Sequence, residues 1–385
     1  MTKKRRILFA IGSLGGGGAE RVLLDQLAKL NRELFSPLLY LVSHSGSLLS
    51  ELPEDVPVFA FDLRNTPPRW NWPGRIHRRL VADLARVIRE QQVDLVFDHT
   101  FHMTLIAGPA AAQRKTPRIS LIVCDPENDF TNNERRFRFF KKQLLIQAYQ
   151  SAEAVVAVSE GVRRAAIAYY GLNPASVQTI YNPIGLERID VLYDQGDLQL
   201  EPGKFHVVCC GRLHPQKGFA YLIEAAEKLV YDQGLTDLRF HILGEGPSRQ
   251  ELEQQIQQKC LSDYVLLEGF QSNPFQYYRE AQLFCLPSLY EGFGLVLAEA
   301  MACHIPVLAT DCPSGPAEIL ADGEFGRLVP PGNAKALADQ LADAVAFYES
   351  WQSTVPAARR HVEQMFDDAA GMRQWEALFE RVCAK

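Results

Sequence analysis

Short apolar runs alternate with stretches of helical periodicity along the whole chain, and this alternation restricts the fold more than any other feature of the sequence. Apolar runs of this length, bounded by turn residues, are typical of buried strands. The expected strands are residues 7–11, 38–42, 95–97, 119–124, 154–158, 207–210, 239–243, 265–267, 283–286 and 307–309. Residues 19–30 and 76–89 carry helical periodicity between strands. The rhythm predicts an α/β protein with two doubly wound parallel sheets and helices on both faces of each.

The chain of 385 residues is long enough for two hydrophobic cores, and the sequence has one good candidate for the junction. At Asn182-Pro183-Ile184-Gly185, Pro183 removes a backbone donor and fixes φ, whereas Gly185 permits a sharp turn. We therefore expect a first Rossmann-like domain over residues 1–183 and a second over 184–360. Residues 361–385 are expected to form a C-terminal helix that packs back toward the first domain.

The composition is that of an ordinary globular protein, with 47% apolar and 22% charged residues. No apolar run reaches the roughly 18 residues of a membrane span, and the run after Arg6 is too short for the core of a signal peptide. The eight cysteines lack C-x-x-C spacing and mostly lie in apolar runs, as reduced buried thiols do. We therefore expect a cytoplasmic protein without disulfides and without a zinc site.

Charge is unevenly distributed along the chain. Residues 1–185 contain 24 Lys and Arg against 17 Asp and Glu, a net charge of +7, whereas residues 186–385 contain 16 against 29, a net charge of −13. A basic half suggests an anionic partner, such as a membrane surface, a phosphorylated acceptor or nucleic acid. Solvated helix faces with a chance excess of basic residues are the alternative.

Ligands of parallel α/β sheets bind beyond the carboxyl ends of the strands, so the loops after the apolar runs are the places to look for chemistry. The first such loop contains four consecutive glycines, of which Gly16, Gly17 and Gly18 lead into a helix. Glycines let a ligand approach the backbone closely, and a helix N-terminus attracts phosphate or carboxylate. The loop lacks the Lys-Ser/Thr of a Walker motif and fits G-x-G-x-x-G poorly. A flexible turn without a ligand is therefore the alternative.

The loop after residues 207–210 carries two cations. Arg212 and Lys217 lie five residues apart in a turn that also contains Gly and Pro, so both can converge on one point. A diphosphate fits such a point, because arginine offers a planar fork to phosphate oxygens and lysine a compact charge. Together they could stabilise a departing nucleotide without a metal ion.

The loop after residues 283–286 is the most informative. Glu291 stands before Gly292-Phe293-Gly294-Leu295, where a helix is expected to begin, and Glu299 follows two helical turns later. Glycines at a helix N-terminus give an anion or a hydroxyl access to the backbone. Glu291 can accept hydrogen bonds from sugar hydroxyls, and Glu299 from the diol of a ribose. For either carboxylate alone, a surface position on a helix is the alternative.

With these motifs in order, nearly the whole chain resembles the large family of retaining glycosyltransferases with the GT-B fold, the group 1 or family 4-like glycosyl transferases. The resemblance rests on E-G-F-G-L-V-L-A-E at 291–299 and G-R-L-H-P-Q-K-G-F at 211–219. Further landmarks are Gly244-Glu245-Gly246-Pro247 and Leu267-Glu268-Gly269-Phe270, the latter near the expected base pocket. G-G-A-E-R-V at 17–22 is similar to members that transfer N-acetylhexosamines or related sugars from UDP-sugars in lipid-linked glycan and surface polysaccharide assembly.

The resemblance implies a role for each motif residue. Arg212 and Lys217 would neutralise the donor diphosphate, and Glu299 would bind the ribose. Glu291 would hold the donor sugar with help from backbone amides of Phe293 and Gly294. The implied donor-binding set also contains Gly16, Gly17, Gly18, Gly244, Phe270, Gly292 and Leu295. In this family the leaving phosphate assists the incoming hydroxyl, so the resemblance implies retention without a carboxylate nucleophile, a metal or a cofactor beyond the nucleotide-sugar co-substrate.

Two histidines are candidates for a contact with the sugar. His99 follows the D-L-V-F-D pattern of residues 94–98 and matches a histidine that many relatives carry at the domain cleft. A neutral imidazole there could hydrogen-bond a sugar hydroxyl. Relatives that transfer hexosamines often lack this histidine, so a structural role is the alternative for His99, and His102 is the weaker candidate.

Two basic segments suggest contact with a membrane or an acceptor. Trp70 and Trp72 lie among arginines, as in membrane-interface anchors. A helix over residues 135–144 would gather basic side chains on one side and apolar side chains on another, which is the pattern of an interfacial helix. The basic side is Arg135, Arg138 and Lys142, and the apolar side is Phe137, Phe140 and Leu144. An ordinary surface loop and a core-packed helix are the alternatives.

The sequence therefore predicts a hexosyltransferase that moves an N-acetylhexosamine or a hexose from a UDP-linked donor to a glycan or lipid-linked acceptor. The acceptor is expected on the basic first domain, with the protein peripheral on the cytoplasmic face of a membrane. A UDP-sugar epimerase or a phosphorylase of the same fold is an alternative, and so is a non-catalytic sugar-nucleotide scaffold. Mixed aromatic and basic segments also bind single-stranded nucleic acid, but the donor motifs argue against that partner.

Overall fold

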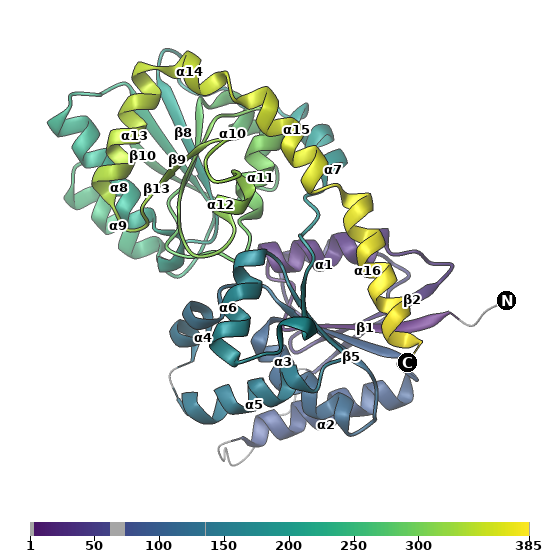
Figure 1. The fold of residues 1–385 in the computed structure, drawn as a ribbon. Coiled ribbons are helices and arrows are strands. Elements are labelled where there is room, and N and C mark those ends of the chain that lie inside the picture. Colours follow the sequence, from purple (N-terminus) through teal and green to yellow (C-terminus); the bar gives the residue numbers. More distant parts are fainter. Residues whose placement is uncertain (1–3, 62–73, 135, 385) are drawn as a thin grey trace. The chain divides into compact units, whose positions relative to one another are not determined.

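The computed structural model describes residues 4–61, 74–134 and 136–384, which form two compact units (Figure 1). The first unit comprises Met1–Pro183 and Ala369–Lys385, and the second comprises Ile184–Asp368. The sequence placed the end of the second domain at residue 360, inside helix α15 (Val355–Met365). The second unit extends further because residues beyond 360 pack against it. The ring centroid of Phe366 lies 5.0 Å from that of Phe293, and the ring of His361 stacks on Phe325 at 4.4 Å.

The first unit is built on a seven-stranded sheet in which every pairing is parallel, with the order β3-β2-β1-β4-β5-β6-β7. Its central strands are buried on both faces, which explains why their sequences read as unbroken apolar runs. The strands are β1 (Arg5–Ile11), β2 (Phe35–Leu41), β3 (Val58–Ala60), β4 (Leu95–His99), β5 (Arg118–Ile122), β6 (Ala154–Ala157) and β7 (Val177–Thr179).

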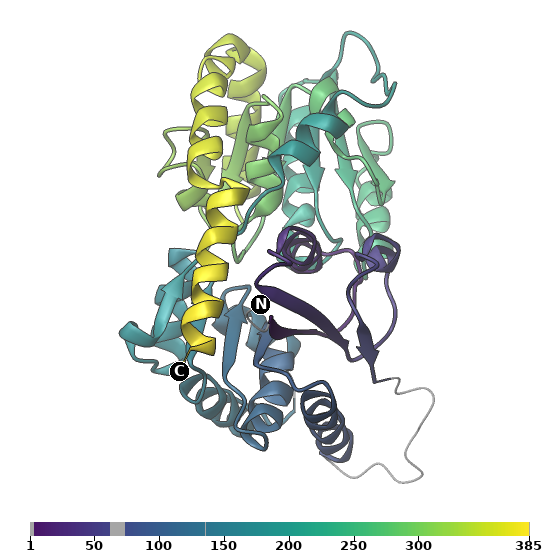
Figure 2. The same cartoon turned by 90° about the vertical axis from the view of Figure 1, so that its right-hand side faces the viewer.

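Helices cover this sheet, and the C-terminal helix α16 belongs to the same unit (Figure 2). Its aromatic side chains pack into the core. Phe379 of α16 packs edge-on against Phe9 and Phe35, with ring centroids 6.1 and 6.0 Å away. Trp375 lies 4.8 Å from Phe97. The helices are α1 (Gly18–Lys29), α2 (Arg75–Glu90), α3 (Thr100–Ala112), α4 (Pro126–Asn133), α5 (Arg138–Gln150), α6 (Glu160–Tyr170) and α16 (Asp368–Cys383).

The second unit has a six-stranded sheet with the order β10-β9-β8-β11-β12-β13, again parallel throughout. The strands are β8 (Phe205–Cys210), β9 (Leu238–Leu243), β10 (Val265–Gly269), β11 (Leu283–Leu286), β12 (Val307–Thr310) and β13 (Arg327–Val329). The helices are α7 (Leu186–Tyr193), α8 (Phe219–Glu227), α9 (Arg249–Gln258), α10 (Phe275–Glu280), α11 (Leu295–Ala302), α12 (Pro316–Ile319), α13 (Ala334–Ala346), α14 (Tyr348–Gln352) and α15.

Each sheet has one place where the strand order reverses. It lies between β1 and β4 in the first unit and between β8 and β11 in the second. At such a switch point the loops after two adjacent strands diverge to opposite faces, and ligands of doubly wound folds bind there. The expected doubly wound α/β architecture is thus confirmed. In the first unit the Gly-rich loop follows β1 and His99 ends β4. In the second unit the loop with Lys217 follows β8 and the loop with Glu291 follows β11.

Candidate donor site

The loops that follow β8 and β11 are packed tightly against each other. The Leu289 amide donates to the Gln216 carbonyl at 2.7 Å, and the Gln216 side chain donates to the Tyr290 carbonyl at 3.0 Å. Gly218 has a φ of +67°, and a Cβ atom there would lie 1.9 Å from the carbonyl oxygen of Pro287. Only glycine fits this position, since both the backbone conformation and the available space exclude a side chain.

This packing brings Lys217 and Glu291 together although they are far apart in the sequence. The Lys217 ammonium lies 2.6 Å from Oε1 of Glu291, and the hydroxyl of Ser288 donates to the same oxygen at 2.6 Å. Glu291 is 5% exposed and Ser288 is fully buried. The hydroxyl of Thr310 in turn donates to the Ser288 carbonyl. A nearly buried carboxylate is therefore held in place by a cation and a fixed hydroxyl.

Positive charge is concentrated in the loop after β8. Arg212 is exposed, and His214 lies between it and Lys217 in the sequence. The pKa of His214 is lowered by burial and, beyond that, by the positive charges of Arg212 and Lys217. Both cations therefore lie near this histidine.

Two glycines with positive φ allow the neighbouring loops to close around this region. A Cβ atom on Gly244, after β9, would lie 2.0 Å from the Gly211 carbonyl oxygen. A Cβ atom on Gly315, after β12, would lie 2.0 Å from the Phe293 carbonyl oxygen. Helix α11 begins directly after Gly294, whose φ of +94° is left-handed. The contact of Gly315 holds Gly292-Phe293-Gly294 in place, and Leu295 begins the helix. The sequence predicted the start of this helix, but not the glycine contacts that support it.

Glu299 lies on α11, about one turn after its start at Leu295, and is largely buried. Its carboxylate is 3.5 Å from the guanidinium of Arg188 on α7, a residue that the sequence did not single out. The Arg188 guanidinium also lies 5.6 Å above the ring centroid of Phe275. Phe270, after β10, is 56% exposed, so its ring is accessible to a ligand.

In the first unit the Gly-rich segment is exposed at the start of α1. Gly17 caps the helix, and Gly16 has a φ of +99°. His99 ends β4 and is fully buried, with its ring 4.3 Å from Phe97 and 6.3 Å from Phe9. This burial lowers the pKa of His99 to about 3. The surroundings of His99 are those of a packed core residue, so the predicted hydrogen bond to a sugar would require the ring to be uncovered first.

Comparison with known proteins identifies the family. Over 329 residues the chain is 30% identical to N-acetylgalactosamine-N,N'-diacetylbacillosaminyl-diphospho-undecaprenol 4-alpha-N-acetylgalactosaminyltransferase of Campylobacter jejuni, a match that covers 85% of this chain and 86% of that protein. The family models for Glycosyltransferase Family 4 and Glycosyl transferases group 1 match residues 16–188 and 194–361. The chain belongs to the group 1 glycosyl transferases.

Other similar proteins agree with this assignment. N-acetyl-alpha-D-glucosaminyl L-malate synthase of Bacillus anthracis is 25% identical to this glycosyltransferase over 78% of each chain. The crystal structure of Anabaena HepE in complex with UDP-glucose superposes with a TM-score of 0.79 at 23% identity, and covers 98% of this chain and 99% of that one. Because the identity is low, this second likeness concerns the fold, and it confirms the GT-B fold that the sequence predicted.

The structure brings residues to the candidate donor site that sequence reasoning missed. Ser288 lies three residues before Glu291 in the sequence, but the partner of its hydroxyl could not be assigned without the geometry of the loop. Arg188 and Thr310 lie far from that segment in the sequence, on α7 and at the end of β12. No local pattern marks either residue, because their proximity follows from the order of the elements in the sheet.

The two basic segments expected to contact a membrane or an acceptor differ from the prediction in what the structure describes and in where the helix begins. Trp70, Trp72 and Arg135 lie outside the described residues. Helix α5 begins at Arg138, because Phe137 before it has a left-handed φ of +57° and so is not part of the helix. Arg138 donates to the carbonyls of Glu134 and Thr131. Arg138 is therefore engaged with the α4 end of the loop rather than displayed on one helix side.

The ammonium of Lys142 lies 3.4 Å from the ring centroid of Tyr169 on α6. The apolar side chains are exposed as expected, and Phe139 joins them. The exposed residues are Phe137, Phe139, Phe140 and Leu144. His102 is linked to this region through Glu134, whose carboxylate lies 3.3 Å from its Nε2 atom. None of the helices in the described part of the chain is both long and apolar enough to cross a bilayer.

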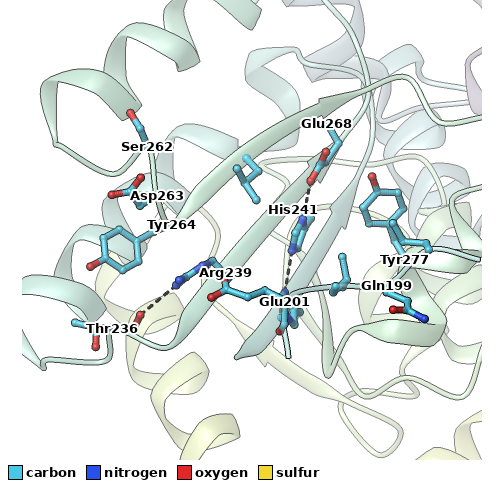
Figure 3. Close-up of a pocket in the computed structure, with 14 residues that line it drawn as sticks. Gln199, Glu201, Thr236, Arg239, His241, Ser262, Asp263, Tyr264, Glu268 and Tyr277 are labelled. Atoms are coloured by element: carbon cyan, nitrogen blue, oxygen red, sulfur yellow. Dashed lines mark hydrogen bonds and ion pairs between the residues drawn. The ribbon is translucent and has the colours of Figure 1, made fainter. Parts of the chain in front are cut away.

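A second polar cluster of the glycosyltransferase lines a cavity of about 740 Å³ beside β8, β9 and β10 (Figure 3). Its lining includes Glu201, Thr236 and Tyr264, which precede these strands. The strands are parallel, so this cavity lies toward their amino ends, whereas the loops with Lys217 and Glu291 lie at the carboxyl ends. The cavity and the candidate donor site are therefore separate places in the second unit.

The cavity contains a chain of hydrogen bonds between buried rings. Nε2 of His206 lies 2.8 Å from the Glu201 carbonyl oxygen, and its Nδ1 lies 2.9 Å from Nε2 of His241. Nδ1 of His241 lies 2.7 Å from Oε1 of Glu268. A carbonyl only accepts, so each of the three contacts needs its own proton. Two neutral imidazoles carry two, so the third contact, between His241 and Glu268, needs one additional proton.

Proposed function

We propose that this glycosyltransferase moves a sugar from a UDP-linked donor, with retention of anomeric configuration, to a glycan or lipid-linked acceptor in surface polysaccharide or glycolipid assembly. The observation that supports it most strongly is the meeting of Lys217 and Glu291 at the switch point between β8 and β11. A cation for the diphosphate and a carboxylate for the sugar stand side by side there, as a nucleotide sugar requires.

In this proposal Arg212 and Lys217 neutralise the diphosphate, and Glu299 binds the ribose beside Arg188. Glu291 holds the sugar with the amides of Phe293 and Gly294, while Gly244 and Phe270 flank the nucleotide. The Anabaena neighbour was solved with UDP and with UDP-glucose, which supports UDP as the nucleotide. The name of the Campylobacter relative supports an N-acetylhexosamine and a lipid-linked diphosphate acceptor.

Chemistry in this proposal needs neither a metal nor a carboxylate nucleophile. Arginine and lysine stabilise the charge that develops on the leaving diphosphate, and a phosphate oxygen accepts the proton of the incoming hydroxyl on the same face of the sugar. Transfer should then be unaffected by EDTA, and a UDP-α-sugar should give an α-linked product. A β-linked product in proton NMR spectra, or activity that returns only with added Mg²⁺ after chelation, would refute this mechanism.

A panel of UDP-, GDP- and ADP-sugars tests the function directly. The thermal shift should be largest with a UDP-sugar, and that donor should support transfer. Glu291→Gln should lower kcat by at least about 100-fold, because an interaction with the sugar is lost in the transition state. Glu251→Gln, on the exposed side of α9, is the matched control and should retain full activity. The function is refuted if no nucleotide sugar shifts the melting temperature or is consumed.

The same panel separates the transferase from an epimerase. An epimerase would convert a UDP-sugar into its epimer without any acceptor, whereas the transferase should consume the donor only slowly by hydrolysis until an acceptor is added. Analysis of the residual UDP-sugar for an epimer, with and without acceptor, gives the answer. Accumulation of an epimer as the main product would replace our proposal by the epimerase.

We also propose that the protein associates with an anionic membrane surface through the exposed residues Phe139, Phe140 and Leu144 of α5. The basic charge of the first half and three apolar side chains on one short helix support this proposal. Liposomes with anionic lipid should sediment the protein, less so at high salt. Phe139→Ser/Phe140→Ser should weaken binding, and Phe347→Ser, an equally exposed phenylalanine of the second unit, should not. No binding at low salt would refute the proposal.

A further inference from the structure

The carboxylate of Glu291 receives two hydrogen bonds on one oxygen. The Lys217 ammonium and the Ser288 hydroxyl both lie 2.6 Å from Oε1. Oε2 is thereby left as the oxygen that faces away from these two donors. A sugar hydroxyl would find its acceptor at Oε2, provided that the carboxylate keeps this orientation.

Lys217 cannot serve two anions equally. In the proposed function, on which this inference rests, its ammonium neutralises the donor diphosphate, yet in the structure it pairs with Glu291. A diphosphate carries more charge than one carboxylate and accepts from several directions, so donor binding should draw the ammonium toward the phosphates. Glu291 would then lose a cation at the step when its orientation matters most.

Ser288 is held independently of the donor. It follows β11, is fully buried, and its carbonyl accepts from the hydroxyl of Thr310 at the end of β12. The backbone of Ser288 should therefore stay in place when the ammonium moves, which keeps its hydroxyl within reach of Glu291. Because hydroxyl and ammonium bind the same carboxylate oxygen, one can keep the carboxylate in place after the other leaves.

We propose that Ser288 is the positioning residue for Glu291, and that it fixes this carboxylate while the Lys217 ammonium moves from Glu291 to the donor diphosphate. Ser288 touches no substrate in this account and acts only through Glu291. Its loss should therefore affect the pose of the sugar, which Glu291 holds, and not the grip on the nucleotide, which other residues hold.

The test compares Ser288→Ala with Ser288→Cys, which preserves most of the volume but donates hydrogen bonds poorly. Both variants should lower kcat by about 10- to 100-fold, the range expected for a misplaced reacting group. The affinity for UDP, which lacks the sugar, should stay within about 2-fold of the wild type. A tenfold change would correspond to about 1.4 kcal/mol of binding free energy. Ser248→Ala, at the start of α9, is the control for loss of a buried serine and should keep its kcat.

The outcomes separate this inference from the proposed function. If the wild type neither binds nor uses a nucleotide sugar, the proposed function fails. If the wild type is active and Glu291→Gln is not, but both Ser288 variants retain full kcat, only the positioning role is overturned. A parallel loss of UDP affinity and kcat in the folded Cys variant would also overturn it, since Ser288 would then support the loop as a whole.

Discussion

At the scale of single residues, the pairing of Lys217 with Glu291 explains how one site can be stable without a ligand and still receive an anion. A buried carboxylate without a partner is costly, and Lys217 and Ser288 together remove most of that cost. The same cation is the one expected to meet the diphosphate. Preorganisation of the empty site and affinity for the donor thus depend on one side chain.

Replacement of Lys217 by Gln tests this dependence. The amide can still donate to Glu291, but the charge for the diphosphate is lost, so the affinity for UDP should fall by about 10- to 100-fold. Isothermal titration calorimetry measures the change. Lys259→Gln is the control, because it removes an ammonium that follows α9 and pairs with Glu227 at the end of α8. Unchanged UDP affinity in Lys217→Gln would show that Lys217 does not contact the diphosphate.

His99 makes a prediction about pH. Burial lowers its pKa to about 3, below the value of about 6.5 that the unfolded chain would show. Between these two pKa values the unfolded state therefore binds more protons than the folded state. The stabilisation from neutral, buried His99 is fully present above about pH 6.5 and is lost as the pH falls toward about 3, by up to about 1.4 kcal/mol per pH unit. His99→Leu should make the stability of the first unit less sensitive to acid.

Hydrogen exchange of the β1 and β4 amides at pH 7 and pH 5 measures this effect, after correction for the intrinsic exchange rate. The wild type should lose more protection than His99→Leu between the two pH values. Equal losses would mean that His99 is not a neutral core residue. That result would favour an exposed ring able to meet a sugar.

At the scale of elements, the hydrogen-bonded chain beside β8, β9 and β10 is sensitive to a change of one atom. A ring nitrogen of His241 and a carboxylate oxygen of Glu268 lie 2.7 Å apart and need a proton between them, and we expect this additional proton on a ring. Other ionisable groups also face the chain: Glu201 before β8, Arg239 on β9, Asp263 and Tyr264 before β10, and Tyr277 on α10. The paired charges of Arg239 and Glu201 offset each other. The charge of Glu268 therefore decides where the proton is held.

In Glu268→Gln the amide can donate to His241 itself, and two neutral rings then satisfy all contacts. Nitrogen-15 NMR of labelled histidines at pH 7 should show one ring with both nitrogens protonated in the wild type and none at these two positions in the variant. Glu245→Gln, at a carboxylate paired with Arg249, should leave the spectrum unchanged. Two neutral rings in the wild type would place the additional proton on Glu268 and contradict the expected doubly protonated ring.

At the scale of the whole molecule, the sequence was sufficient to predict the two parallel sheets, because buried central strands produce apolar runs that local periodicity reveals. It did not reveal β3, β7 and β13, since three-residue edge strands are too short to form such a run. Lys217 and Glu291 could be predicted because each stands in a local motif at a strand end. Ser288, Thr310 and Arg188 could not, because their roles depend on which strands and helices become neighbours.

Phe137 shows a second limit of sequence reasoning. Helical periodicity counted it with Phe140 and Leu144, yet its backbone is left-handed and the helix begins one residue later, at Arg138. Periodicity describes which side chains would share a side if the helix existed, and not where it begins. The boundary expected at residue 360 has a related origin, since the contact of Phe366 with Phe293 extends the second unit beyond it and no local pattern reveals that contact.

The central claim is that the nucleotide sugar binds at the switch point between β8 and β11, and hydrogen–deuterium exchange with and without UDP tests it most directly. We predict slower exchange in residues 211–218 and 288–296, with residues 198–206 and 262–266 around the second cavity unchanged. Protection at that cavity, with no change in the loops after β8 and β11, would contradict it.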